Sequence, residues 1–414
     1  MSTRRTRRLL GPMSLPLLVG SLSAACAAHP HDHVDGHPSV LGTTVGDGGA
    51  LGISDPGPGG ILVSASGEVL ALEGYPFPPV NPGDTAFVDG WSMRFDRLLV
   101  TVDHVVLADS PDQSPTDESQ TGPVVAEQDG PWAIDLHVGG PLQGKGGNGE
   151  QAVPFTSFTS QNKNGGAPFD PSQRYAFGFD VVPATSNAIN VNLDAAAMSD
   201  YQDMIAKGYT VLYVGTATFQ GASCTTSDPS YDFSKLPTTV HFRFGFKSPT
   251  SYVNCQNPDN DPAQPFPGEE HERGVQVLPN RSIIAQVTIH TDHPFWESTV
   301  HDTPAHFDQI AARYVGLDGG APLATLDDQI GVDFTAFHDG SGAPLPWRSC
   351  LSTYVIPASG TMGFDAHGVP VDPGGSPAQG LRDYRDFMTY NQSTQGHLNS
   401  DGLCFVRRNY PSPR

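Results

Sequence analysis

Alternation of apolar and polar residues with a period of two is the strongest pattern along the chain. In RYAFGFDVV, Tyr175, Phe177 and Phe179 would lie on one face of an extended strand. TVHFRFGF at 239–246 and SIIAQVTIH at 282–290 repeat the pattern, as does WAIDLHV. Many such short segments are typical of antiparallel sheets with one face on the core. We therefore predict a mainly β protein, folded as an antiparallel β-sandwich.

Apolar spacings of three and four residues predict only a few short surface helices. SDYQDMIAKG has Ser199 as a candidate N-cap and Gly208 as a stop. DTPAHFDQIAARYVG has Thr303 as a candidate N-cap and Pro304 at the first helical position. A third helix is expected to begin at Ser376-Pro377.

The N-terminus carries a predicted export signal. Residues 1–25 combine the basic stretch MSTRRTRR with a short apolar run broken by Gly and Pro, which is typical of a secretory signal peptide. The run ends at Cys26 after small residues and resembles the lipobox of bacterial lipoproteins, although the usual Leu has moved to Leu22. We expect lipidation at Cys26 and, because Ala27 replaces Asp, anchoring at the outer membrane, on its periplasmic face or at the cell surface.

The rest of the chain is expected to form three parts. Residues 26–70 are Gly-, Pro- and His-rich and predict a lipidated flexible tether. Residues 71–345 hold most of the strand patterns and predict the sandwich body. Residues 346–414 are expected to be a C-terminal extension that packs on the body and is linked by disulfides.

The number of cysteines suits an oxidising compartment. Once Cys26 is set aside for the lipid, Cys224, Cys255, Cys350 and Cys404 remain. Four thiols predict two disulfides with three alternative connectivities. We favour 224 with 255 and 350 with 404, because each pair lies within one segment; free thiols are the alternative.

Charge and motifs narrow the functional classes. The chain has 44 acidic and 22 basic residues, a net charge of −22 that disfavours nucleic acid as a partner. It contains no G-x-S-x-G elbow, H-E-x-x-H helix motif, P-loop or Rossmann fingerprint. The sequence therefore assigns no catalytic residue, and we favour a protein that is not an enzyme.

The stretch TIHTDHPFWESTVHDTPAHFD, residues 288–308, is the main candidate site because histidines and carboxylates are concentrated in it. Neutral imidazoles and carboxylates are normal ligands of zinc and copper. A hydrogen-bonded structural corner is the alternative. The candidate metal ligands are His290, Asp292, His293, His301 and His306.

Other histidines suggest further metal contacts. His137 and His241 lie on the polar faces of two predicted strands and would converge with His290 if the three strands were neighbours. His104 is in line with apolar positions, which predicts a buried histidine with a backbone partner. The tether contributes a second tract, HPHDHVDGH, whose histidines would bind metal loosely without a fold: His29, His31, His33 and His37.

A loop in NPDNDPAQPFPGEE carries oxygen ligands at alternate positions: Asn257, Asp259 and Asp261. This spacing resembles the start of a calcium loop, but Pro262 replaces the glycine of an EF-hand and no glutamate stands at position twelve. The pattern therefore leaves only a loose structural calcium site as a hypothesis.

The segments RFDRLLVTVDHVVLA and GPWAIDLH resemble two groups of bacterial β-sandwich envelope proteins. One is the MbnP-like copper-binding family, and the other is an uncharacterised lipoprotein family. The first resemblance implies copper bound by histidines, without any ligand motif that can be aligned here. We therefore expect a cell-envelope lipoprotein that binds copper or zinc. The alternatives are a non-catalytic adhesion module that binds glycan or protein and, less favoured, a metal-dependent hydrolase or oxygenase.

Overall fold

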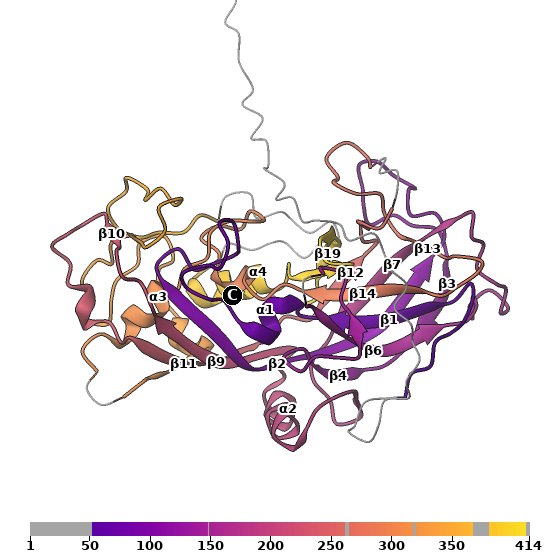
Figure 1. Ribbon diagram of the computed structural model, residues 1–414, viewed down its shortest axis with the longest axis horizontal. Coiled ribbons are helices and arrows are strands. Elements are labelled where there is room, and N and C mark those ends of the chain that lie inside the picture. Colours follow the sequence, from indigo (N-terminus) through magenta and orange to yellow (C-terminus); the bar gives the residue numbers. More distant parts are fainter. Residues whose placement is uncertain (1–51, 148, 261–264, 318–319, 367–380, 411–414) are drawn as a thin grey trace, which may run out of the picture. The chain divides into compact units, whose positions relative to one another are not determined.

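The computed structural model (Figure 1) describes residues 52–147, 149–260, 265–317, 320–366 and 381–410. These residues all belong to one compact unit of the chain. The predicted signal peptide, Cys26, the histidines of the tract at 29–37, Asp261 and the expected helix start at Ser376 lie outside the described residues.

The protein is mainly β, as predicted, and its strands form two large sheets. The smaller sheet has six strands in the order β18-β17-β14-β1-β6-β5. Its strands are β1 (Ile61–Ser66), β5 (Leu142–Gln143), β6 (Gln151–Phe158), β14 (Ile283–Ile289), β17 (Gly396–Leu398) and β18 (Gly402–Leu403).

The larger sheet has eleven strands and is built around the long strand β2. Its main path is β15-β11-β9-β2-β7-β12-β19; β3 and β4 also pair with β2, β13 pairs with β7, and β8 pairs with β4. The bounds are β2 (Trp91–Ala108), β3 (Val124–Gln128), β4 (Trp132–Asp135), β7 (Arg174–Val181), β8 (Ile189–Asn190), β9 (Val211–Phe219), β11 (Thr239–Phe246), β12 (Thr250–Val253), β13 (Val275–Gln276), β15 (Leu323–Thr325) and β19 (Phe405–Arg408). A separate pair joins β10 (Thr225–Thr226) to β16 (Arg348–Ser349).

The two sheets share one hydrophobic core, which gives the arrangement of a sandwich. Phe177 and Phe242 from the larger sheet and Val287 from the smaller one are all fully buried in this core. The rings of Trp132 in β4 and Phe155 in β6 meet edge to face at 5.0 Å. Alternate residues therefore face inward, as the period of two predicts.

Three strand pairs depart from the antiparallel prediction. β1 pairs with β14, β11 with β15 and β4 with β8, and all three pairs are parallel. β1 is also fully buried between β14 and β6, so the predicted tether is wrong for residues 61–66. Parallel strands are joined by a long connection rather than by a hairpin. The alternation of residues within a strand does not reveal which distant strand becomes its partner.

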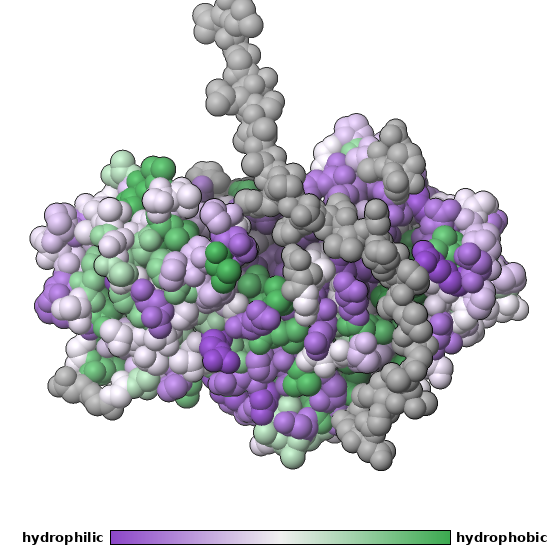
Figure 2. Space-filling view, viewed as in Figure 1, coloured by the Kyte–Doolittle hydropathy of each residue, from purple (hydrophilic) through white to green (hydrophobic). Residues whose placement is uncertain are grey.

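Helices are few and short: α1 (Glu68–Glu73), α2 (Ala195–Lys207), α3 (Asp308–Ala311) and α4 (Tyr384–Gln392), with single 3-10 turns η1 (Phe233–Lys235), η2 (His293–Phe295), η3 (Ala312–Tyr314) and η4 (Leu326–Gln329). Hydrophilic residues gather beside α2 on the face seen in Figure 2. Among the described residues, no helix combines the length and the apolar character needed to cross a bilayer.

Two predicted helix starts are wrong. α2 begins at Ala195 after Asp194, whose side chain accepts a hydrogen bond from the Ala197 amide, so Ser199 lies inside the helix. α3 begins at Asp308 rather than after Thr303, because Ala305 forms β-bridges with Phe87 and Trp296 that hold this backbone extended. Gly208 does end α2 in the left-handed conformation, as predicted.

Two disulfides form, but not with the pairing that we favoured: Cys224 bonds to Cys350 and Cys255 bonds to Cys404. Strand pairing explains both bonds. The register of β10 and β16 places Thr225 opposite Ser349, next to the first bond, and the register of β12 and β19 places Val253 opposite Phe405, close to the second. Both disulfides tie the C-terminal residues to the body, and β17, β18 and β19 complete its sheets, so this part is integral to the fold.

Replacing Cys255 and Cys404 together by Ala should lower the free energy of unfolding by about 3–5 kcal/mol, because the bond closes a long loop of the unfolded chain. Its sequence separation is 149 residues. Urea denaturation measures the loss, and peptide mapping without reductant checks the connectivity. A crosslinked peptide that joins Cys224 to Cys255 would contradict the structure.

Candidate metal centre

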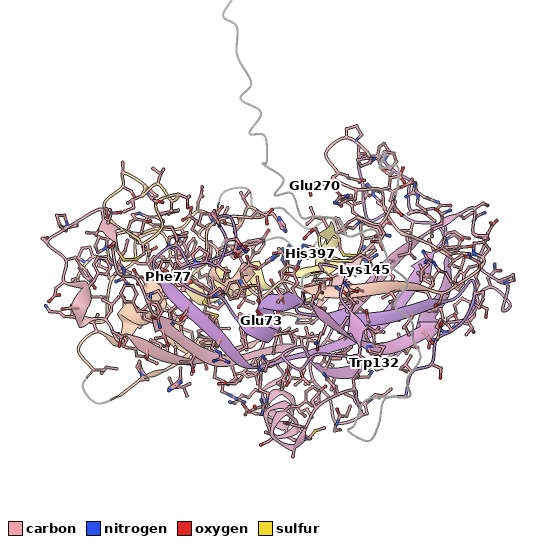
Figure 3. The ribbon with its side chains drawn as sticks, viewed as in Figure 1. Glu73, Phe77, Trp132, Lys145, Glu270 and His397 are labelled. Atoms are coloured by element: carbon pink, nitrogen blue, oxygen red, sulfur yellow. A yellow bond between two sulfur atoms is a disulfide. The ribbon has the colours of Figure 1, made fainter. Side chains whose placement is uncertain are left out.

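Three histidines from two distant segments meet at one end of the smaller sheet. His290 follows β14, His293 opens η2, and His397, which is labelled in Figure 3, lies in β17. One ligand atom from each of the three lies within 4.8 Å of the others. The ring centroids of His290 and His397 are 4.1 Å apart, and those of His293 lie 5.4 Å and 5.5 Å from them. This group could hold a metal ion.

Backbone pairing between β14 and β17 brings these segments together. The two strands are antiparallel, with Thr288 opposite His397. Two residues after Thr288, the His290 amide donates a hydrogen bond to the Gln395 carbonyl at 3.0 Å. The meeting of His290 with His397 is therefore a consequence of strand register rather than of sequence proximity.

Nitrogen atoms of the two buried rings lack hydrogen-bond partners. His293 is 0% exposed and His397 is 1% exposed. Within the described residues, Nε2 of His293 and both ring nitrogens of His397 have no partner. Most buried polar atoms in proteins are hydrogen-bonded, and leaving one unpaired costs about 1–3 kcal/mol. A metal ion would satisfy Nε2 of His293 and one of the two nitrogens of His397.

The tautomer of His293 leaves Nε2 ready to bind a cation. Its Nδ1 lies 2.8 Å from the Thr394 hydroxyl oxygen, and that hydroxyl donates its hydrogen to the Asn391 carbonyl. The hydroxyl must therefore accept from Nδ1–H, which places the ring's lone pair on Nε2. Metal-binding histidines usually donate their other ring N–H in this way.

His290 is oriented by a similar contact on the opposite side of the site. Its Nε2 donates to the Ser400 carbonyl at 3.0 Å and lies 3.5 Å from a Glu68 carboxylate oxygen. Because a carbonyl can only accept, the lone pair of the neutral ring lies on Nδ1. His290 is thus held by a carbonyl and a carboxylate, the usual outer partners of a metal-binding histidine.

Burial and neighbouring charge set the protonation of the three rings. Burial lowers the pKa of His293 and of His397 well below the ordinary range, and the nearby imidazoles of His290 and His301 lower it further. Burial also lowers the pKa of His290, but the charges of Glu68 and other acids outweigh it, so this pKa is raised. Two rings are therefore neutral and poised to act as ligands.

Glu68 is the most perturbed carboxylate beside the site. Burial raises its pKa to about 7, opposed by the charge of His290 and reinforced by Glu150, Asp401 and Asp292. Glu68, His290 and Asp401 form a second set whose ligand atoms lie within 4.8 Å of one another. The site therefore has an inner face of imidazoles and an outer face of carboxylates.

His301 and Asp292, both predicted ligands, lie at the edge of the inner group. The His301 ring is 5.4 Å from the rings of His293 and His397, and its side chain is 36% exposed. Asp292 accepts a hydrogen bond from the Trp296 indole N–H at 3.0 Å. The Trp296 ring stacks on His293 at 3.7 Å, so Asp292 orients the wall of the site instead of joining the three-histidine set.

His306 does not belong to the cluster. Its Nε2 lies 2.7 Å from a Glu297 carboxylate oxygen, and the Tyr354 hydroxyl donates to the same oxygen. The His306 ring packs among Trp347, Tyr354 and Phe364. The predicted helix would have aimed His306 at the strand end, but the extended backbone at 303–306 leaves it in this aromatic pocket.

The predicted convergence of strand-face histidines does not occur. His137 follows β4 and His241 lies in β11, both in the larger sheet, whereas His290 extends the smaller one. His137 Nδ1 contacts the Ala71 carbonyl and His241 Nδ1 contacts the Thr216 hydroxyl. His104 is exposed rather than buried: it has a positive φ of 45° at an irregularity in β2.

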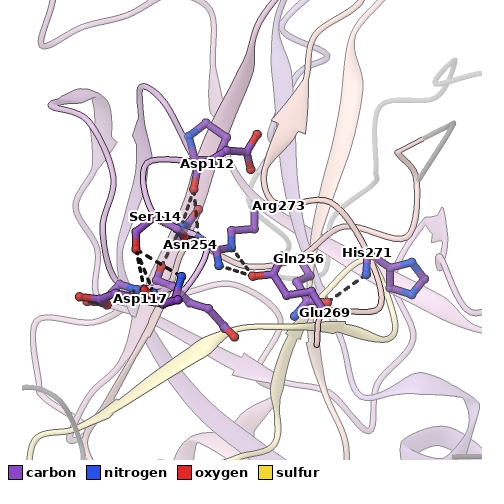
Figure 4. A network of polar contacts seen from close by, with 12 residues as sticks. Asp112, Ser114, Asp117, Asn254, Gln256, Glu269, His271 and Arg273 are labelled. Atoms are coloured by element: carbon purple, nitrogen blue, oxygen red, sulfur yellow. Dashed lines mark hydrogen bonds and ion pairs between the residues drawn. The ribbon is translucent and has the colours of Figure 1, made fainter. Parts of the chain in front are cut away.

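The calcium hypothesis is not supported at the two described positions. The Asn257 side-chain oxygen accepts from the Asp259 amide and from Asn399, and Asp259 binds Asn399 and Lys145. The neighbouring network in Figure 4 centres on Arg273, a fully buried guanidinium whose Nε donates to Glu269 at 2.7 Å. Groups of the protein itself therefore bind the described oxygens of Asn257 and Asp259, and the third predicted ligand, Asp261, lies outside the described residues.

The sequence patterns missed His397, Glu68 and Asp401. At His397, the only local signal was GHL followed by the turn-forming residues NSDG, which is a weak hairpin pattern. Glu68 has a positive φ of 62° directly after β1, in a segment that we expected to be tether. All three residues lie near His290 because strands that are distant in the sequence pair with each other. A single His, Glu or Asp in the sequence does not reveal that pairing.

The three imidazoles form a group that could hold a metal ion. No protein-family model matches the chain, and neither the curated proteins nor the solved structures contain a match to it.

Proposed function

We propose that this protein is a cell-envelope lipoprotein that binds a transition metal, copper or zinc, through His290, His293 and His397. The observation that carries the proposal is the convergence of three imidazoles within 4.8 Å, two of them buried with unpartnered nitrogens. Buried polar atoms in protein cores rarely lack a hydrogen-bond partner. A cation that accepts one lone pair from each ring removes the cost of the missing partners at His293 and at one nitrogen of His397.

The ligand type supports copper or zinc over harder cations. Imidazole suits these borderline metals, whereas magnesium and calcium require oxygen ligands. His301 is the nearest additional imidazole and is positioned at the exposed edge of the group. The resemblance of 94–108 and 130–137 to the MbnP-like family implies copper but supplies no ligand motif, so the proposal keeps both copper and zinc.

The cellular location is part of the same proposal. Two disulfides suit an oxidising compartment such as the bacterial periplasm. The signal-like segment 1–25 and the lipobox-like Cys26 suit export and lipid anchoring. A metal-binding body held at the envelope would capture or store its cation outside the cytoplasm.

His397→Ala should weaken metal binding at least about 100-fold, because it removes one of three converging ligands. Loss of a ligand should cost more affinity than loss of a residue that only hydrogen-bonds to a ligand, which costs about 10–100-fold. The measurement is Cu²⁺ titration followed by tryptophan fluorescence, since Trp296 stacks on His293 and a bound Cu²⁺ would quench it. All variants carry Asn at the four tract histidines, so that loose binding at 29–37 does not contribute. We call this chain the tract-free background.

His241→Ala is the matched control, because His241 is an exposed histidine on the larger sheet. It should bind Cu²⁺ with the affinity of the background. Equal affinity in the His397 and His241 variants, or no stoichiometric binding in the background, would refute the metal site. The second result would favour the adhesion module as the function.

Metal affinity should rise with pH because protons compete for the imidazole lone pairs. His293 and His397 have lowered pKa values and are already neutral near neutral pH, whereas His290 has a raised pKa and must lose one proton on binding. The apparent affinity should therefore increase about tenfold per pH unit below the His290 pKa and level off above it. Competition titrations between about pH 5.5 and about pH 8.5 measure this slope; an affinity independent of pH would contradict it.

A further inference from the structure

The outer face of His290 has the composition of a second cation site. Glu68, at the start of α1, and Asp401, in the turn after β17, place carboxylate oxygens within 4.8 Å of a His290 nitrogen and of each other. The Ser400 carbonyl lies 3.0 Å from His290 Nε2. Two carboxylates, one carbonyl and one imidazole are therefore gathered at one point.

The spacing of these atoms fits ligands around one ion. His290 Nε2 lies 3.0 Å from the Ser400 carbonyl oxygen and 3.5 Å from Glu68 Oε1. Adjacent ligands at about 2.1 Å from a metal are separated by about 3.0–3.4 Å in octahedral or tetrahedral geometry. A cation bound here would replace the hydrogen on Nε2.

Surrounding charge favours a cation at this point. Glu150 and Asp292 act on Glu68 as like charges, in addition to Asp401. Glu150 accepts from the Gln286 side chain and from the Gly146 amide, so its oxygens are occupied and it contributes only charge. One cation between Glu68 and Asp401 would relieve the mutual repulsion of these groups.

We propose that Glu68, Asp401, the Ser400 carbonyl and His290 Nε2 bind a second divalent cation, so that His290 bridges two metal ions. The proposal rests on the proposed function, because the inner ion uses the other nitrogen of the same ring. With both ions bound, His290 has released its ring protons and is an imidazolate. The oxygen-rich set takes a divalent ion such as Cu²⁺, Zn²⁺ or Mn²⁺ rather than Cu⁺.

The two sites can be separated by substitution, because only His290 belongs to both. His397 serves the inner site alone, whereas Glu68 and Asp401 serve the outer site alone. Glu73, an exposed carboxylate at the other end of α1, provides a matched control. Asp401→Asn tests the outer site separately from Glu68, whose backbone conformation is unusual.

The experiment is Cu²⁺ loading of the tract-free background, with copper counted by elemental analysis and its spins counted by electron paramagnetic resonance. The background and its Glu73→Gln variant should bind two Cu²⁺ per chain with reduced spin intensity, because an imidazolate couples the two spins antiferromagnetically. Glu68→Gln combined with Asp401→Asn, and Asp401→Asn alone, should bind one Cu²⁺ with full intensity. His397→Ala should also give uncoupled Cu²⁺.

Three results would overturn the proposal. The first is a single Cu²⁺ in the background that the Glu68 and Asp401 variants leave unchanged. The second is two bound Cu²⁺ with full spin intensity. The third is a Glu73→Gln variant that loses as much copper as the Glu68 and Asp401 variants. These outcomes leave the inner site intact, because they do not concern His397. Failure of the inner site has a different signature, namely that His397→Ala changes neither copper count nor coupling.

Discussion

The antiparallel pairing of β14 with β17 is the interaction on which the candidate centre depends. It joins segments more than one hundred residues apart, and its register places His397 opposite Thr288, two residues before His290. The Asn399 side chain accepts from the Gln286 amide, and the Ser400 amide donates to the Thr288 hydroxyl, which lock this register. A one-residue slip would turn His397 to the opposite face of the sheet. The Cys255–Cys404 disulfide covalently holds the C-terminal hairpin next to its partners.

Electrostatic repulsion between like groups at this point is what the proposed metal site requires when no cation is bound. On the inner side, burial and the neighbouring imidazoles lower the pKa values of His293 and His397, while carboxylates gather on the outer side. A structure selected for stability alone would pair such groups or replace them by apolar ones. Their gathering at one buried to half-buried point agrees with ligands held ready for positive charge.

Local sequence predicted the strands but not their partners. The alternation at 174–181, 239–246 and 283–289 depends on neighbouring residues, and those strands form with the predicted faces inward. His290, His293 and His301 could be grouped because a single turn joins them. His397 and Glu68 arrive through strand pairing, which local patterns do not encode, and the disulfide pairing was wrong for the same reason. His306 was misplaced because bridges at Ala305 prevented the helix start that Thr303-Pro304 indicates.

X-ray absorption spectroscopy of the metal-loaded tract-free background tests the central claim most directly, because it reports the atoms bound to the metal. With one equivalent of Zn²⁺ or Cu²⁺, the account predicts a first shell dominated by nitrogen at about 2.0–2.1 Å, with the outer-shell scattering of about three imidazole rings. A shell of oxygen atoms without imidazole scattering would contradict the claim that His290, His293 and His397 form a metal centre.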